Sequence, residues 1–139
     1  MAEANEDGLD EIRERRRREL EAKIAGEGTP ETPTEPVHVD GRGELASVVA
    51  AHDVVLVDFY ADWCGPCKML EPTVESIAAN TGGVVAKVDI DRNQSLAGEY
   101  GVRSVPTMLL FVDGEPAERL VGVRPEPELV ELVEGHLGS

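Results

Sequence analysis

Residues 54–60 have the sequence VVLVDFY, an almost continuous apolar run of strand length in which Asp58 is the one charged residue. A run that does not alternate between apolar and polar residues is typical of a strand buried on both faces of a sheet. Such a strand has to be covered from both sides by other elements. This single run therefore directs the chain toward a layered architecture with a central sheet.

The remaining sequence from Val37 onward alternates between strand-like and helix-like segments. We expect strands over 37–39, 54–60, 84–90, 107–112 and 118–123, and helices over 43–52, 66–80, 94–100 and 127–137. Asp113 and Gly114, between the last two strands, are a hairpin turn signal. This order predicts an α/β fold with a central mixed β-sheet flanked by helices on both faces.

Two of the expected helices carry an apolar side that should face the sheet. In the helix over 66–80 this side consists of Leu70, Val74, Ile77 and Ala78. In the last helix it consists of Leu129, Leu132, Val133 and Leu137. Pro72 removes the hydrogen bond to the Lys68 carbonyl, so we expect it to kink its helix and interpret it as structural.

Residues 1–36 differ in composition and form what we call the N-terminal extension. Acidic residues precede basic ones by four positions, which favours a partly helical segment over 9–25. These pairs are Glu11–Arg15, Glu14–Arg18 and Glu19–Lys23. The stretch GEGTPETPTEP then predicts a flexible linker before a folded domain over 37–139. The extension is either a solvated tail or a docking helix for another protein. It contains eleven acidic and six basic residues, so its net charge is negative despite the run of arginines.

The formal net charge of −15 argues against binding nucleic acids or anionic membranes, because both would repel the chain. Only three of the thirteen basic residues are lysine. Arginine used in place of lysine, together with many carboxylates, favours a protein adapted to high salt, where screening weakens the self-repulsion. The alternative is an ordinary acidic protein.

The opening residues lack the apolar core of a signal peptide, and the apolar runs are too short to span a bilayer. We therefore expect a cytoplasmic protein that does not associate with membranes. Thiols in that compartment are kept mostly reduced, so a cysteine pair there is more often catalytic or metal-binding than structural.

The only two cysteines, Cys64 and Cys67, lie in the pentapeptide WCGPC directly after the buried run. A zinc site would need further ligands, but the histidines are scattered, so we expect no metal. A structural disulfide closing so small a loop would stabilise little. Two inert core cysteines are also conceivable, although Gly65 and Pro66 between them are unusual for core packing. The fourth interpretation is a redox pair.

The position of the pair supports the redox interpretation. A strand that ends at Tyr60 and a helix that begins near Cys64 place that sulfur at a helix N-terminus. Unpaired backbone N–H groups and the helix dipole stabilise a thiolate there. Pro66 suits the first helical turn, where its missing N–H costs nothing.

The segment VLVDFYADWCGPCKMLEPTVESIA, followed by KVDID and VRSVPTMLLF, resembles the thioredoxin family over roughly residues 37–137. The resemblance implies the thioredoxin fold and a dithiol–disulfide oxidoreductase that reduces disulfides in target proteins, without a cofactor. It also implies a thioredoxin reductase as partner, and we expect a monomer. The N-terminal extension lies outside the resemblance.

Together with the helix-start argument, the resemblance implies that Cys64 is the exposed attacking thiolate and Cys67 the shielded resolving thiol. Asp58 is costly to bury unless it is used. It is either a paired structural acid or, as the resemblance supports, the proton acceptor for Cys67. The resemblance makes Lys87, on the adjacent strand, its electrostatic neighbour; otherwise Lys87 is an ordinary exposed strand lysine.

The resemblance also implies a cis peptide bond before Pro106, although an arbitrary X–Pro bond would be trans. The backbone of Val105 would then pair with an extended substrate segment. We expect an apolar substrate-binding surface around Cys64. It consists of Trp63, Gly65, Pro66, Val105, Pro106 and Gly122.

Two alternatives to a general reducing enzyme stay open at this point. One is a disulfide-forming or isomerising member of the same family, although Gly65 and Pro66 between the cysteines resemble the reducing branch. The other is a thioredoxin-fold subunit or adaptor of a larger complex, recruited through the N-terminal extension. A measured reduction potential distinguishes the first alternative from a general reducing enzyme. A pull-down with and without residues 1–36 tests the second.

Salt should stabilise the fold if the acidic composition is an adaptation. Residues 37–139 contain seventeen acidic and seven basic residues, so self-repulsion should weaken the folded state in dilute buffer. We expect a higher melting temperature in molar salt, where the Debye length is about 3 Å, than in dilute buffer. Calorimetry or circular dichroism checks this, and a melting temperature that stays constant or falls with salt would exclude the adaptation.

Overall fold

The computed structural model describes residues 32–138. The predicted helix over 9–25 and most of the linker lie outside the described residues. Five strands form one mixed sheet in the order β1-β3-β2-β4-β5. The strands are β1 (Val37–His38), β2 (Val54–Tyr60), β3 (Val84–Asp89), β4 (Thr107–Val112) and β5 (Glu115–Val121). The helices are α2 (Gly41–Ala51), α3 (Gly65–Asn80), α4 (Gln94–Glu99) and α5 (Glu126–Leu137).

The central position belongs to β2, the strand predicted from the apolar run. It pairs with β3 in parallel and with β4 in antiparallel. The sheet is completed by β1, parallel to β3, and by β5, antiparallel to β4. Every residue of β2 except the half-buried Tyr60 is buried. The predicted mixed sheet and the burial of this strand on both faces are therefore confirmed.

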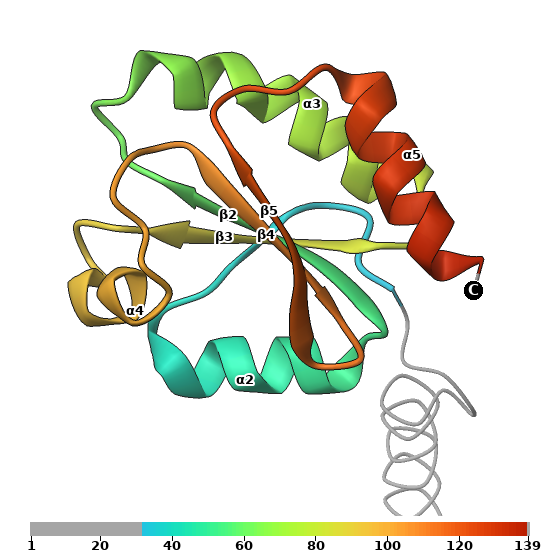
Figure 1. Cartoon of the computed structure of the whole chain (residues 1–139), viewed down its shortest axis with the longest axis horizontal. Helices are drawn as coiled ribbons and strands as arrows, with labels where there is room; N and C mark the ends of the chain where they lie inside the picture. Colours follow the sequence, from blue (N-terminus) through green and yellow to red (C-terminus); the bar gives the residue numbers. More distant parts are fainter. Residues whose placement is uncertain (1–31, 139) are drawn as a thin grey trace, which may run out of the picture. The chain divides into compact units, whose positions relative to one another are not determined.

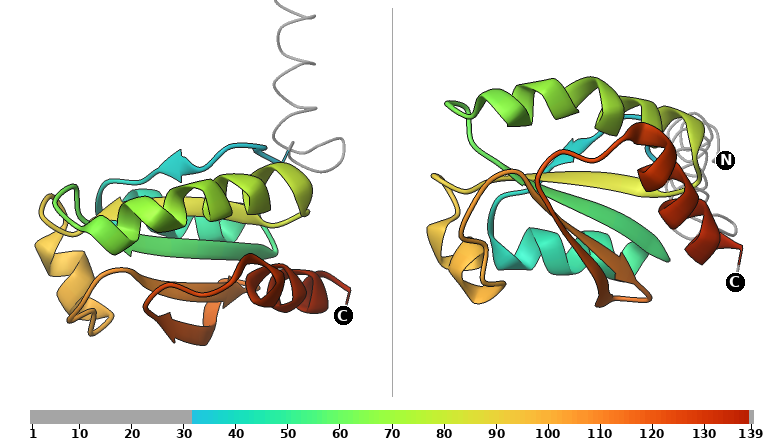
Figure 2. Two further views of the ribbon diagram at one scale, coloured as in Figure 1. Left: turned by 90° about the horizontal axis from the view of Figure 1, so that it is seen from above. Right: turned by 45° about the horizontal axis from the view of Figure 1, so that its top comes forward.

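Helices cover both faces of the sheet, as predicted. Figure 1 shows α3 and α5 on one side and α2 and α4 on the other, and the turned views of Figure 2 show the same layers. One core cluster joins Leu56 of β2 to Leu70 and Leu129 of the first pair of helices. The other joins Val57 to Leu45 and Leu96 of the second pair. Successive residues of β2 thus enter two separate cores.

The predicted apolar sides of the helices pack largely as expected. All four residues predicted on the inner side of α3 are buried. In α5, Leu129 and Val133 are buried and Leu132 is partly buried. The prediction for Leu137 is wrong, because this residue lies at the last turn of α5 and is 36% exposed.

The last strand differs most from its predicted bounds. We expected 118–123, and β5 spans Glu115–Val121. Asp113 and Gly114 both have positive φ values, 54° and 87°, which is the geometry of a two-residue turn that starts antiparallel pairing at once. The strand ends before Gly122, whose N–H donates to the Pro106 carbonyl at 2.8 Å.

Candidate active site

The two cysteines lie where β2 gives way to α3. Ala61 accepts a backbone hydrogen bond from Cys64 at 3.1 Å and so closes the short link after the strand. Cys64 is the N-cap of α3, and Pro66 lies in the first turn of the helix. The predicted helix start is therefore confirmed, with Cys64 at the position where unpaired N–H groups point outward.

Cys64 and Cys67 form a disulfide, with their Cα atoms 5.3 Å apart. The Cys67 backbone N–H donates to Cys64 Sγ at 3.2 Å. After reduction of the disulfide, the same N–H and the helix dipole stabilise a negative charge on Cys64 Sγ. No equivalent donor reaches Cys67 Sγ among the hydrogen bonds of the described residues. The helix start thus distinguishes the two sulfurs electrostatically.

Exposure does not distinguish them in this state. Both cysteines are 4% exposed, so the expectation that Cys64 is exposed is wrong for the disulfide form. The sulfur of Cys64 points toward Cys67 and lies 3.7 Å from the Val105 carbonyl oxygen. The pair packs with buried Ala61 and half-buried Tyr60. Bonded to each other, both sulfurs contribute to a small core cluster.

The residues predicted to surround Cys64 come together from three parts of the chain. Trp63 is 69% exposed, which excludes a core-packing role for it. Its indole Nε1 donates to Asp91 Oδ2 at 2.9 Å. Gly65 and Pro66, which follow Cys64, are also exposed. This side of the cysteine pair is an exposed surface that an aromatic ring dominates.

The other side of the pair is formed by the loop before β4 and the end of β5. The Val105–Pro106 peptide bond is cis, as the resemblance implied. Val105 is half-buried, and its carbonyl faces Cys64. Gly122 is half-buried and is tied to the Pro106 carbonyl. Pro106 itself is buried, so the expected apolar surface includes less of this ring than predicted.

Asp58 is buried in β2 and is 1% exposed. Burial, which disfavours the charged carboxylate, raises the pKa of Asp58 from 3.8 to about 6; nearby Lys87 opposes the rise and Glu71 adds to it. Its Oδ1 atom has no hydrogen-bond partner among the described residues. A carboxyl group in this environment holds and releases a proton near neutral pH.

Lys87 lies opposite Asp58 in the parallel register of β2 and β3, so the two side chains share one face of the sheet. It is not an ordinary exposed strand lysine, because only 7% of it is exposed. Its Nζ lies 3.4 Å from Glu71 Oε2 and 4.5 Å from the centre of the Tyr60 ring. The buried ammonium is thus held by a carboxylate and by an aromatic face.

Three residues of this region were missed by the sequence reasoning. Glu71 and Tyr60 contact Lys87, and Asp91 binds Trp63. Glu71 follows Cys67 by four residues on a helix, which places both on one side of it; this spacing was the available signal. Asp91 directly follows the end region of β3, and nothing in its sequence context pointed to Trp63.

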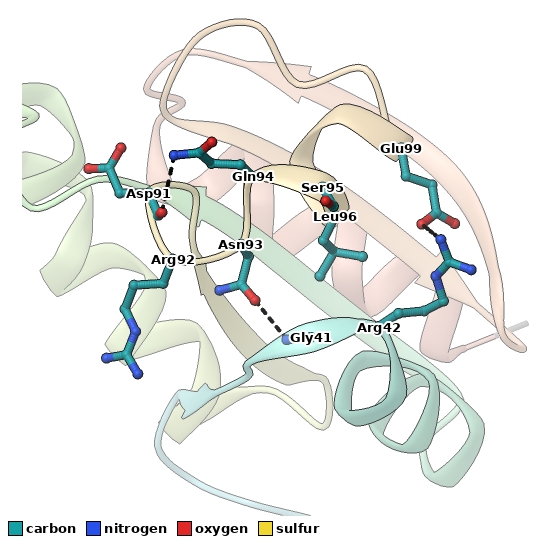
Figure 3. A pocket seen from close by; sticks show the side chains of 9 residues that line it. All are labelled: Gly41, Arg42, Asp91, Arg92, Asn93, Gln94, Ser95, Leu96 and Glu99. Atoms are coloured by element: carbon teal, nitrogen blue, oxygen red, sulfur yellow. Dashed lines mark hydrogen bonds and ion pairs between the residues drawn. The ribbon is translucent and has the colours of Figure 1, made fainter.

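A pocket of about 490 Å³ lies beside this region, between the first residues of α2, the loop after β3 and α4 (Figure 3). Asn93 connects the start of α2 to the end of β3, because its side chain accepts a hydrogen bond from Gly41 N at 2.7 Å and donates one to the Asp89 carbonyl at 3.0 Å. Arg42 pairs with Glu99 across the opening at 2.6 Å. These polar groups bind one another, and the pocket contains neither cysteine, so we interpret it as a structural junction.

Within residues 32–138, no group of three or more histidine, cysteine or acidic side chains has a geometry suited to a metal ion. No helix of this described region is both long and apolar enough to cross a membrane. The groups that the site presents are the cysteine pair and the buried carboxyl group of Asp58. A disulfide between CxxC cysteines at a helix start, directly after a strand that contains a buried acid, is the arrangement of a dithiol–disulfide oxidoreductase.

Comparison with known proteins identifies the family. The thioredoxin family profile matches residues 37–135. Thioredoxin from Bacillus subtilis is 47% identical over 101 residues, which cover 71% of this chain and 97% of that protein. Thioredoxin from Staphylococcus aureus is 46% identical over 86 residues, covering 60% of this chain and 83% of that protein. The chain belongs to the thioredoxin family.

Solved structures agree with this assignment. A mutant thioredoxin from Halobacterium salinarum is 55% identical with a TM-score of 0.75, covering 76% of this chain and 94% of that one. Thioredoxin from Plasmodium falciparum is 31% identical with a TM-score of 0.64, covering 71% of this chain and 97% of that one. The chain thus has the thioredoxin fold and is a thiol–disulfide oxidoreductase with a redox-active disulfide.

The raised pKa of Asp58 should make stability depend on pH. The protonated form contributes stability that is complete below the unfolded-state pKa of 3.8 and is lost as the pH rises through about 6. Asn at this position stays neutral. Relative to wild type, Asp58→Asn should therefore gain about 2 kcal/mol of unfolding free energy as the pH rises from about 4 to about 7.

Denaturant unfolding of the oxidised protein at several pH values measures this difference. Asp62→Asn is the matched control, because Asp62 is an exposed acid four residues further along. Parallel pH profiles for wild type and Asp58→Asn would show that Asp58 titrates alike in the folded and unfolded states.

Proposed function

We propose that the protein reduces disulfides in target proteins, with Cys64 as the nucleophile and Cys67 as the resolving thiol. The observation that carries this assignment is the hydrogen bond from Cys67 N–H to Cys64 Sγ at 3.2 Å at the start of α3. It favours negative charge on one sulfur of the pair. The thiolate is the reactive form of cysteine, so the favoured sulfur attacks first.

The reaction proceeds in two exchanges. Cys64 Sγ attacks one sulfur of the substrate disulfide, forms a mixed disulfide and releases the other substrate sulfur as a thiolate. Cys67 Sγ then attacks Cys64 Sγ, which releases the second substrate sulfur and forms the Cys64–Cys67 disulfide. The substrate gains two electrons, and the cysteine pair loses two. A thioredoxin reductase, the family's reductant, returns the pair to the dithiol.

Asp58 acts in this proposal as the proton acceptor for Cys67. The second exchange requires Cys67 to lose its proton, and an apolar surrounding disfavours the thiolate. Asp58 is buried on the face of the sheet that α3 covers, and its pKa of about 6 suits a base near neutral pH. Lys87 acts through its charge as the neighbour of this carboxylate.

The substrate segment binds on the surface around the cysteines. Exposed Trp63 lies on one side and half-buried Val105 on the other. An extended peptide that pairs with the Val105 backbone, as in strand addition, brings its disulfide next to Cys64. Gly65, Pro66 and Gly122 leave room for it, since none of them extends a bulky side chain over the sulfurs. Pro106 is buried and holds the loop before β4 that carries Val105.

We further propose that the protein works as a monomer in the cytoplasm of a salt-adapted organism. The acidic composition and the similarity to a Halobacterium salinarum structure support the salt adaptation. A reducing activity needs a compartment in which its own thiols stay reduced, which supports the cytoplasm. The partners are then disulfide-containing proteins and a reductase, rather than nucleic acids or membranes.

The roles of the two sulfurs predict different fates for two variants. Cys67→Ser still attacks substrates but cannot resolve the mixed disulfide, so covalent complexes should accumulate. Cys64→Ser lacks the favoured thiolate and should trap at least about tenfold less. The readout is a non-reducing gel after exposure to a disulfide-containing protein such as insulin, with a small dithiol added to dissolve the complexes. Equal trapping by both variants would contradict the assigned roles of the two sulfurs.

We propose that the folded domain over 37–139 suffices for the chemistry and that the N-terminal extension does not take part. The cysteines, Asp58 and the surface residues all lie in the segment that the family profile matches. Removal of residues 1–36 should leave the rate of reduction of a small disulfide unchanged. A large loss of that rate in the truncated protein, with the fold retained by circular dichroism, would assign the extension to the active site.

A further inference from the structure

Lys87 lies between two carboxylates that approach it from different elements. Asp58, on β2, lies next to Lys87 on the same face of the sheet, through the parallel register that pairs the two residues. Glu71 reaches it from α3, with Oε2 at 3.4 Å from Nζ. The lysine side chain is 9% exposed and that of Glu71 is 49% exposed. One buried ammonium thus has a buried carboxylate, Asp58, and a half-exposed carboxylate, Glu71, as neighbours, and it binds the half-exposed one.

The Lys87 ammonium contacts Glu71 and Tyr60 rather than Asp58. Its hydrogen bond goes to Glu71, and the Tyr60 ring lies 4.5 Å from Nζ. The Oδ1 atom of Asp58 has no hydrogen-bond partner among the described residues. A buried carboxylate next to a free ammonium would draw it in, because a charge pair in a poorly hydrated site is strongly attractive. Glu71 competes with that attraction.

The surroundings of Asp58 offer few other charges. β3 presents Lys87, and α3 presents Glu71. On the other side β4 presents uncharged Met108 directly opposite. Tyr60 follows on the same strand and interacts electrostatically with Asp58. The charge state of Asp58 is therefore governed mainly by one ammonium and by the carboxylate that binds it.

We propose that Glu71 is a positioning residue that holds the Lys87 ammonium away from Asp58 and so keeps Asp58 able to accept a proton from Cys67. This inference rests on the proposed role of Asp58 as the base. Glu71 acts in two ways with the same sign. Its negative charge disfavours a second negative charge on Asp58, and its ion pair uses the positive charge that would stabilise one.

Loss of Glu71 should therefore weaken the base. In Glu71→Gln the ammonium stays buried, and Asp58 becomes its nearest carboxylate. The pKa of Asp58 then falls, so that the acid limb of the resolving step moves to lower pH. Because Glu71 is half exposed, solvent screens part of its effect, and we expect a shift of about half a pH unit. At pH values above this acid limb, the resolving step of Glu71→Gln should be slower than that of wild type, because a less basic carboxylate takes a proton less readily.

The resolving step is measured with a small aromatic disulfide that releases one absorbing thiolate in each exchange. The second release, recorded by stopped flow from about pH 5 to about pH 9, reports the attack of Cys67 on Cys64. Glu75→Gln is the matched control. Glu75 lies one turn further along α3 and lines the same pocket as Glu71 and Lys87, but it makes no ion pair with Lys87 in the described structure.

A double-mutant cycle separates positioning from general effects. Glu71→Gln in an Asp58→Asn background should leave the profile of Asp58→Asn unchanged, because coupled residues lose their mutual effect when one is absent. Carbon NMR of the Asp58 carboxyl in the full-length protein gives its pKa without any catalysis. In Glu71→Gln this pKa should fall, and in Glu75→Gln it should stay close to the wild-type value.

The outcomes distinguish this inference from the proposed function. If Asp58→Asn alone leaves the second release unchanged across the pH range, Asp58 is not the base, and both fail. If Asp58→Asn slows it while Glu71→Gln shifts neither the profile nor the NMR titration, only the role of Glu71 fails. An equal shift in Glu75→Gln, or a shift that persists without Asp58, would likewise overturn it, because surface charge alone would then explain the effect.

Discussion

The burial of β2 on both faces is the constraint on which the rest of this structure depends. Its residues enter two cores in turn, so that α3 and α5 are needed on one side and α2 and α4 on the other. Because the strand is central, its carboxyl end is surrounded by neighbouring segments. The chain that leaves it at Tyr60 turns at once into α3 and presents Cys64 at the helix start.

The same burial explains why one acid in this strand is chemically different from the others. An apolar strand excludes water from Asp58 and raises its pKa to about 6. The carboxyl therefore costs stability when it is charged. It lies on the face that α3 covers, the helix whose first turn carries the cysteines. The side chain proposed as the base is thus also the one that lowers the stability of the fold when it is charged. The fold tolerates this loss because the rest of the strand is apolar.

Much of the fold could be predicted because its strongest signals are local. The apolar runs of β2 and β4 have the predicted bounds, 54–60 and 107–112. The bounds of β5 could not be predicted, because this strand is exposed along most of its length and contains Pro116. Its start depends on a two-residue turn and on pairing with β4 rather than on its own composition. Leu137 was misplaced because helical periodicity does not show how far along a helix the apolar side stays buried.

The site could be predicted only where neighbours in sequence are also neighbours in space. Cys64, Cys67 and the apolar context of Asp58 are visible in one short segment, whereas the contacts of Lys87 with Glu71 and Tyr60 come from the packing of α3 on the sheet. Among the described residues Asp58 is the only buried acid. Molar salt screens exposed carboxylates within about 3 Å but screens a buried pair much less. Glu71, half exposed and bound to a buried ammonium, therefore connects the acidic surface to Asp58, the proposed base.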